Sequence, residues 1–279
     1  MAELYSLFAY LPFECFQAQF MQRALVGLLL FAPLTAVMGV QVVNFRLAFF
    51  SDAISHSAFA GVALGLLFAV SPSLTMPLFG LAVGMGIVLI RRHSRLSSDT
   101  VIGVFFSAVM AFGLAVISRD APTARNVQAF LYGDILTVSD ADILGLAGLC
   151  VILLLFQIVG YNRLLYIGLN PVLAKAHRVQ VVLWQYAFAA LLALVVTFSV
   201  RAVGVFLVTA MLIVPAATAR NLARSAGSMF WWALAVSVTT TMAGLIISAQ
   251  DWARTATGAT IILVACLCFV CSLLVAEKE

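Results

Sequence analysis

Nine long apolar segments run through the sequence and limit its fold more than any other feature. Each approaches the roughly 20 residues that an α-helix needs to cross the hydrocarbon core of a bilayer. They are residues 23–43, 51–70, 74–90, 100–117, 143–159, 181–200, 203–219, 229–248 and 258–275. Segment 203–219 contains Pro215 with Thr209 and Thr218, a pattern that is also compatible with a broken or re-entrant helix. We therefore predict an all-α, polytopic integral membrane protein with eight or nine transmembrane helices.

The composition excludes a soluble protein and gives no sign of a second domain. Of the 279 residues, 64% are hydrophobic and only 9% are charged, whereas soluble proteins carry about 25% charged residues. The net charge of +4 comes from basic residues scattered in ones and twos, which form no nucleic-acid-binding face. We expect residues 1–279 to form a single transmembrane domain that interacts with lipid and not with nucleic acid.

The basic residues of the loops predict an orientation, because lysine and arginine accumulate on the cytoplasmic side. If the N-terminus is outside and every segment spans, the inner side holds twice as many basic residues as the outer side. The inner set is Arg46, Arg91, Arg92, Arg95, Arg163, Lys175, Arg178, Arg220, Arg224 and Lys278, and the outer set is Arg23, Arg119, Arg125, Arg201 and Arg254.

Two polar side chains stand out inside the second apolar segment. Asp52 and His56 are four residues apart, so on a helix they lie one turn apart on nearly the same face. A carboxylate oxygen with an imidazole nitrogen suits zinc, manganese or iron. The alternatives are an Asp–His hydrogen bond that joins two helices, or Asp52 as a helix cap. Ser55 and Ser57 are candidates for supporting contacts, although serines in membrane helices usually bond backbone carbonyls.

The polar stretch 160–180 is the longest predicted inner connection. Within it, Asn170 and Pro171 predict the start of a short helix, since asparagine favours the N-cap and proline the first helical position. A short amphipathic helix at the inner face is a natural docking surface for a soluble partner. A simple loop helix is the alternative.

Other motifs give weaker signals. Gly61 and Gly65 form a small-x-x-x-small pair that favours close helix packing. Asp134, Asp140 and Asp142 surround the start of the fifth segment and either guide cations or cap the helix. No phosphate-binding loop is present, so we expect any energy from ATP to come from another subunit.

The sequence resembles the membrane permeases of ATP-binding-cassette importers for zinc, manganese and iron. Five segments carry the resemblance in the family's order, and together they are far more specific than any one of them. They are 20–25 (FMQRAL), 51–57 (SDAISHS) with 61–63 (GVA), 99–103 (DTVIG), 131–136 (LYGDIL) with 138–142 (VSDAD), and 202–205 (AVGV) through 212–220 (LIVPAATAR).

The resemblance implies a function and a set of partners. It implies a permease homodimer in the bacterial cytoplasmic (inner) membrane, with cytoplasmic ATPases and an extracytoplasmic metal-binding protein. The permease itself is then not an enzyme and holds no cofactor, and its substrate is the divalent ion. Asp52 and His56 match the family's metal ligands. The family's ATPase-docking helix corresponds to residues 170–179, with the candidate contacts Asn170, Pro171, Leu173, Ala174, Lys175, His177 and Arg178.

The sequence also departs from the family pattern. Arg178 stands where the family usually has glycine, and Asn44 and Phe45 stand where it commonly has two arginines. Ser51 likewise replaces a glycine. Two other functions remain open at this point. One is a permease for metal chelates of the siderophore or cobalamin type, and the other is an ion-coupled carrier in which Asp52 is the coupling site.

Overall fold

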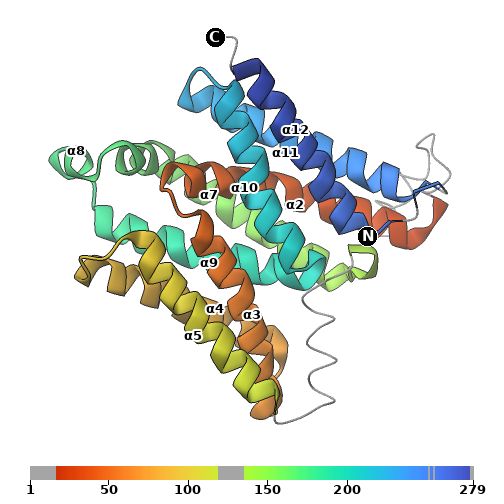
Figure 1. The fold of residues 1–279 in the computed structure, drawn as a ribbon, viewed down its shortest axis with the longest axis horizontal. Helices are drawn as coiled ribbons and strands as arrows, with labels where there is room; N and C mark the ends of the chain where they lie inside the picture. The colour runs from red at the N-terminus through yellow and green to blue at the C-terminus, as the bar shows by residue number, and fades with distance from the viewer. Residues whose placement is uncertain (1–16, 119–134, 251, 254, 277–279) are drawn as a thin grey trace. The chain divides into compact units, whose positions relative to one another are not determined.

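The computed structural model describes residues 17–118, 135–250, 252–253 and 255–276. Throughout this part of the chain, all regular secondary structure is helical, which confirms the predicted all-α class (Figure 1). Several sequence features lie outside the described residues. They are residues 131–134 of the LYGDIL motif, including Asp134, and the basic residues Arg119, Arg125, Arg254 and Lys278.

Nine helices of the described chain are long and apolar enough to cross a membrane. They are α2 (Gln19–Asn44), α3 (Ala48–Leu67), α4 (Pro72–His93), α5 (Ser98–Ile117), α7 (Asp140–Leu169), α9 (Val181–Val203), α10 (Val205–Leu222), α11 (Ala226–Ser248) and α12 (Thr257–Ala276). Two short elements join them, the 3-10 turn η2 (Ile135–Thr137) and helix α8 (Pro171–Ala176). Each of the nine predicted apolar segments therefore corresponds to one helix.

The segment with Pro215 is a continuous helix, not a broken one. Helix α10 follows α9 after the single residue Gly204, whose φ of 87° is a conformation that glycine adopts without steric cost. Pro215 lies inside the helix and has no N–H to donate. Thr209 and Thr218 turn their hydroxyls back onto carbonyls of their own helix, so their polar groups are satisfied without a cavity.

Helix α7 is longer than its apolar core predicts. It continues to Leu169 instead of ending near residue 159, and only Asn170 separates it from α8. The predicted inner connection 160–180 is therefore mostly helical. The extension begins with residues that are not strongly apolar, among them Gly160, Asn162 and Arg163. Hydrophobicity alone therefore places the end of the helix too early.

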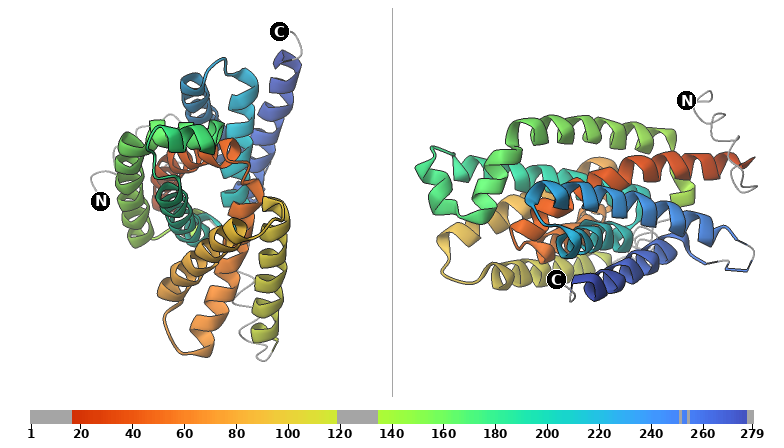
Figure 2. Two further views of the ribbon diagram at one scale, coloured as in Figure 1. Left: turned by 90° about the vertical axis from the view of Figure 1, so that its left-hand side faces the viewer. Right: turned by 90° about the horizontal axis from the view of Figure 1, so that it is seen from above.

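The helices belong to two compact units. Unit 1 comprises residues 1–40, 133–151 and 201–279, and unit 2 comprises residues 41–132 and 152–200. In unit 1, helices α10, α11 and α12 pack against one another; in unit 2, α3 packs against both α4 and α5 (Figure 2). The prediction of a single permease domain stays a prediction.

Glycines allow the closest helix contacts inside each unit. In unit 2, a Cβ at Gly61 would lie 2.8 Å from the Cα of Met76, and one at Gly65 would lie 2.5 Å from Oγ1 of Thr75. In unit 1, a Cβ at Gly244 would lie 2.6 Å from the Cα of Ile261. The predicted role of Gly61 and Gly65 as a close-packing face is thus confirmed, with α4 as their partner.

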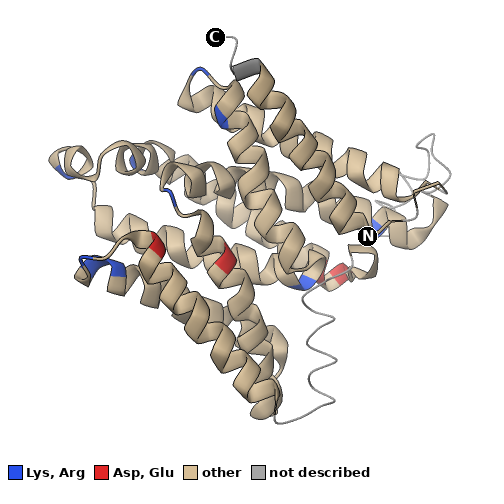
Figure 3. Cartoon of the chain, in the orientation of Figure 1, with Lys and Arg blue, Asp and Glu red and all other residues tan. Residues whose placement is uncertain are grey.

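Charged residues lie mainly near helix ends and in connections, and long stretches of helix carry none (Figure 3). In unit 2, every described lysine and arginine lies near one set of ends: the end of α2, the end of α4, the last turns of α7, and α8. These residues are Arg46, Arg91, Arg92, Arg95, Arg163, Lys175 and Arg178. The described residues at the opposite ends of α3, α4 and α5 include no lysine or arginine.

Candidate metal site and docking helix

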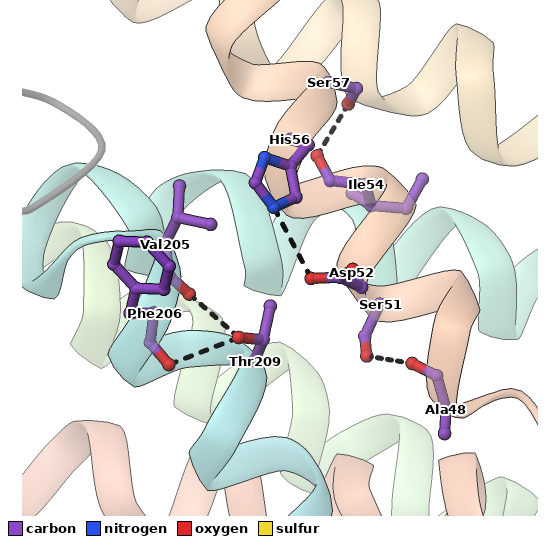
Figure 4. A network of polar contacts seen from close by, with 9 residues as sticks. All are labelled: Ala48, Ser51, Asp52, Ile54, His56, Ser57, Val205, Phe206 and Thr209. Carbon is purple, nitrogen blue, oxygen red and sulfur yellow. Dashed lines mark hydrogen bonds and ion pairs between the residues drawn. The ribbon is translucent and has the colours of Figure 1, made fainter. Parts of the chain in front are cut away.

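Helix α3 brings Asp52 and His56 together one turn apart. Oδ1 of Asp52 and Nε2 of His56 are 3.6 Å apart (Figure 4). This separation is longer than a good hydrogen bond but short enough for both atoms to contact the same ion. The two side chains are 37% and 19% exposed, respectively. The pair is therefore partly buried and still accessible.

The geometry argues against both structural alternatives for this pair. Helix α3 begins at Ala48, with Leu47 at its N-cap, so Asp52 lies in the second turn and is not a cap. The Asp52–His56 contact joins residues of the same helix, so it does not tie two helices together. What remains is an oxygen and a nitrogen that converge from one helix face.

A contact from α5 holds the imidazole in place. The ring of His56 meets the ring of Phe106 edge to face, with centroids 5.2 Å apart and an interplanar angle of 90°. Nδ1 of His56 is buried and has no hydrogen-bond partner among the described residues. The histidine is therefore oriented by packing, with Nε2 turned toward Asp52.

The neighbouring serines divide into two kinds. Ser51 donates to the carbonyl of Ala48 at 2.8 Å, and Ser57 donates to that of Ile54 at 2.6 Å (Figure 4). Both hydroxyls are thus satisfied by the backbone. The hydroxyl of Ser55 is buried and has no partner among the described residues. Nothing in the amino-acid sequence distinguishes Ser55 from Ser51 and Ser57.

The described chain supplies no larger ligand set. Among these residues, no group of three or more His, Cys, Asp or Glu side chains is placed to hold a metal ion. Within this part of the chain, the candidate ligands for an ion there are therefore Asp52 and His56. Such a site suits transient contact better than tight retention.

Helix α8 forms as its sequence predicts. Oδ1 of Asn170 accepts from the backbone N–H groups of Val172, at 2.9 Å, and Leu173, at 3.4 Å, and Pro171 occupies the first turn. Ala174 is completely buried in a cluster with Ile167 and Val181. Ala174 therefore anchors the helix to unit 2 and does not offer a contact surface.

The exposed face of helix α8 is apolar and basic. The exposed fractions of Val172 and Leu173 are 75% and 58%, and Lys175 is also exposed. His177 ends the helix and stacks on Tyr166 of α7, with ring centroids 5.6 Å apart. This face, together with the exposed Arg178, is what a docking protein can reach.

Arg178 adopts a left-handed backbone conformation, with φ of 59°. Its N–H donates to the carbonyl of Lys175, and the N–H of Val179 donates to that of Ala174, both at 3.0 Å. This is the Schellman arrangement, in which the left-handed position is usually glycine. Arg178 therefore holds a glycine-like backbone conformation at an energetic cost. Arg46 and Ala69 occupy the same kind of position, with φ of 55° and 54°, and no glycine or asparagine in the sequence signals either one.

The acidic residues at the start of α7 have structural partners within unit 1. Asp140 pairs with Arg23 at 3.2 Å, and Asp142 pairs with Arg201 at 3.1 Å. Asp142 also accepts from the backbone N–H of Ser139 at the helix start. These contacts favour capping and ion pairing over a cation-guiding role for the two acids.

The fold and the site together define a polytopic helical membrane protein with a polar pair inside one of its helices. Comparison with known proteins makes the class specific. Residues 17–276 match the model of the ABC 3 transport family. The chain belongs to this family, which confirms the resemblance seen in the sequence.

Individual relatives agree over nearly the whole chain. The chain is 31% identical over 254 residues to the high-affinity zinc uptake system membrane protein ZnuB of Haemophilus influenzae, covering 91% of this chain and 96% of that protein. It is 32% identical to the manganese import system permease protein ScaB of Streptococcus gordonii, covering 93% and 92% of the two chains. Among solved structures, PsaBC from Streptococcus pneumoniae in complex with Fab is similar with a TM-score of 0.78 and 29% identity, covering 98% of this chain and 95% of that one.

Proposed function

We propose that this protein is the transmembrane permease subunit of an ABC importer that moves a divalent transition-metal ion, zinc, manganese or iron, into the cytoplasm. The observation that carries the proposal is the convergence of Asp52 and His56 on one face of α3, with oxygen and nitrogen 3.6 Å apart. The family assignment and the names of the zinc and manganese relatives support the same function.

The site is suited to passage of an ion. Burying a carboxylate inside a membrane protein costs free energy, and an arriving divalent cation offsets that cost through direct coordination. The described chain offers two ligands to such an ion, and so small a set holds it weakly enough to depart when the helices rearrange. The permease performs no covalent chemistry in this scheme and needs no cofactor, because ATP hydrolysis takes place in a partner.

The partners follow from the family and from α8. A cytoplasmic ATPase docks on the exposed face of α8, which includes Leu173, Lys175 and Arg178. An extracytoplasmic binding protein delivers the ion, and a second copy of the permease completes a homodimer in the bacterial cytoplasmic membrane. Copurification of an ATPase with the permease separates this function from that of an ion-coupled carrier working alone.

The two donor atoms do not specify which metal is transported. An oxygen–nitrogen pair accepts zinc, manganese and iron, and the general affinity order favours zinc over the other two. The relatives are named for both zinc and manganese. The metal therefore has to be identified by measurement.

The test is elemental analysis of metal-limited cells that lack the permease and carry wild type, Asp52→Ala or His56→Ala. We expect wild type to restore one metal and both variants to lose most of that uptake at equal membrane expression, since each loses one of two ligands. Ser57→Ala is the matched control on α3, because the Ser57 hydroxyl bonds only its own helix among the described contacts. Asp99→Asn is a second control that removes an exposed carboxylate elsewhere.

The outcome is decisive either way. Full uptake by both ligand variants would contradict a bare-ion site at this pair and favour a chelate importer. Loss of expression and assembly in Asp52→Ala would instead indicate that the carboxylate has a structural role.

A further inference from the structure

A cavity of about 260 Å³ lies in unit 2, near the ends where its basic residues gather. Residues of α2, α3, α4, α7, α8 and α9 line it, together with the α2–α3 connection. The polar lining residues are Asn44, Arg46, Arg91 and Gln185, and the apolar ones include Phe50 and Phe188. Because one water occupies about 30 Å³ in the liquid, the cavity has room for a polar group several times larger than water.

The polar lining carries positive charge only. Arg46 and Arg91 contribute guanidinium groups, and no aspartate or glutamate is among the described residues that line the cavity. Neither arginine forms an ion pair with a carboxylate of the described chain. Two nearby basic residues are engaged differently, since Arg92 lies over the ring of Tyr186 and Arg163 over that of Trp184. The two cavity arginines are thus placed to receive an anion.

The start of α3 adds to this positive field. Arg46 and Leu47 line the cavity directly before the helix begins, and no side chain caps the helix at Leu47. The first N–H groups of a 20-residue helix form the positive end of its dipole, which attracts anions. Guanidinium groups combined with a helix N-terminus are a typical donor set for phosphate.

We propose that this cavity binds a phosphate group, with the headgroup of an anionic phospholipid as its main source. Two observations favour lipid over free phosphate. Leu89 and Ile90, next to Arg91 on α4, are 50% and 46% exposed, so an apolar surface suitable for acyl chains adjoins the charge. All seven described basic residues of unit 2 lie toward these ends, as in proteins that face an anionic leaflet.

This site is separate from the metal pair and goes beyond the proposed importer function. Its ligand would be held, not transported, and its effect would be to fix the ends of α3 and α4 against the membrane surface. Binding is measured without metal or ATP, so its failure leaves the metal-import proposal untouched. The competing occupant is a carboxylate of the docked ATPase, which the same guanidinium groups would also accept.

The test is native mass spectrometry of the purified full-length permease after exchange into phosphatidylcholine with increasing phosphatidylglycerol. We expect wild type to retain phosphatidylglycerol preferentially. Arg46→Gln and Arg91→Gln should each weaken retention about fivefold, and the double variant by about 25-fold, since each surface arginine contributes roughly 1 kcal/mol to anionic lipid binding. Arg95→Gln is the matched control, an exposed arginine of the α4–α5 connection outside the cavity lining.

A second arm distinguishes the source of the phosphate. If inorganic phosphate raises the thermal stability of wild type but not of the double variant, while phosphatidylglycerol shows no preference, the anion site stands with free phosphate as its ligand. Lack of preference by wild type for either probe over phosphatidylcholine overturns the proposal, as does an equal loss in Arg95→Gln. Reduced ATPase copurification in the cavity variants without any change in lipid or phosphate binding overturns it in favour of the protein carboxylate.

Discussion

The contact between α3 and α4 at Gly61 provides a sharp test of the packing in unit 2. A methyl group at this position would lie 2.8 Å from the Cα of Met76 and 3.1 Å from the carbonyl oxygen of Thr75. Both neighbours are backbone atoms of α4, so neither can swing aside as a side chain would. Gly61→Ala therefore forces the two helices apart.

The magnitude follows from two opposing effects. Overpacking of this kind costs about 1–3 kcal/mol, while replacing a helical glycine by alanine gains up to about 1 kcal/mol of helix propensity. We expect a net loss of about 1–2 kcal/mol in the free energy of unfolding. For a protein of this size, each kcal/mol corresponds to roughly 2–4 °C in Tm, so Tm should fall by about 2–8 °C.

Gly103→Ala is the matched control, because a Cβ at Gly103 in α5 meets nothing within 4 Å. It gains the helix propensity without the steric cost, so its Tm should stay level or rise. Thermal unfolding of the purified protein in detergent, followed by intrinsic fluorescence and by retention of monodisperse protein, measures both variants. Equal shifts for the two variants, or a higher Tm for Gly61→Ala, would refute the close approach of α3 and α4.

Two further predictions concern α8. Asn170→Ala removes the side-chain oxygen that accepts from the N–H groups of Val172 and Leu173, and losing this N-cap should cost about 1 kcal/mol of helix stability. We therefore expect less ATPase to copurify with this variant than with wild type. Gln180→Ala, at an exposed position beyond the helix, should leave the amount of copurified ATPase unchanged. Arg178→Gly should raise the Tm by about 1–3 °C, because relief of the left-handed strain, about 1–2 kcal/mol, exceeds the cost of the added chain entropy of glycine, about 0.5–1 kcal/mol. A lower Tm, or an altered metal preference, would contradict the interpretation of Arg178 as a strained helix cap in a docking element.

The helices of this protein could be predicted because their signal is local. Each apolar segment must satisfy its backbone hydrogen bonds within itself to lie in lipid, so length and hydrophobicity predict the nine helices. The same local logic places Asp52 and His56 one turn apart and predicts the cap at Asn170. The end of α7 was misplaced because Gly160 and Arg163 interrupt the apolar run without ending the helix.

The environment of the metal pair could not be predicted in the same way. The contact of His56 with Phe106 joins α3 to α5, and no periodicity in either segment specifies which faces meet. The sequence also allowed Asp52 to be a helix cap. Helix α3 begins at Ala48, so Asp52 lies inside the helix and does not cap it. The hydroxyls of Ser51 and Ser57 donate to backbone carbonyls, whereas that of Ser55 has no partner among the described residues.

By itself, then, the sequence determined the class of the protein, the positions of its membrane helices and the residue types of its candidate ligands, because these depend on hydrophobicity and on spacing along one helix. Only the tertiary structure decided which backbone Gly61 touches and how Arg46 and Arg91 come to share a cavity. Those features join residues far apart in the chain, and their geometry depends on how complete helices pack within a unit.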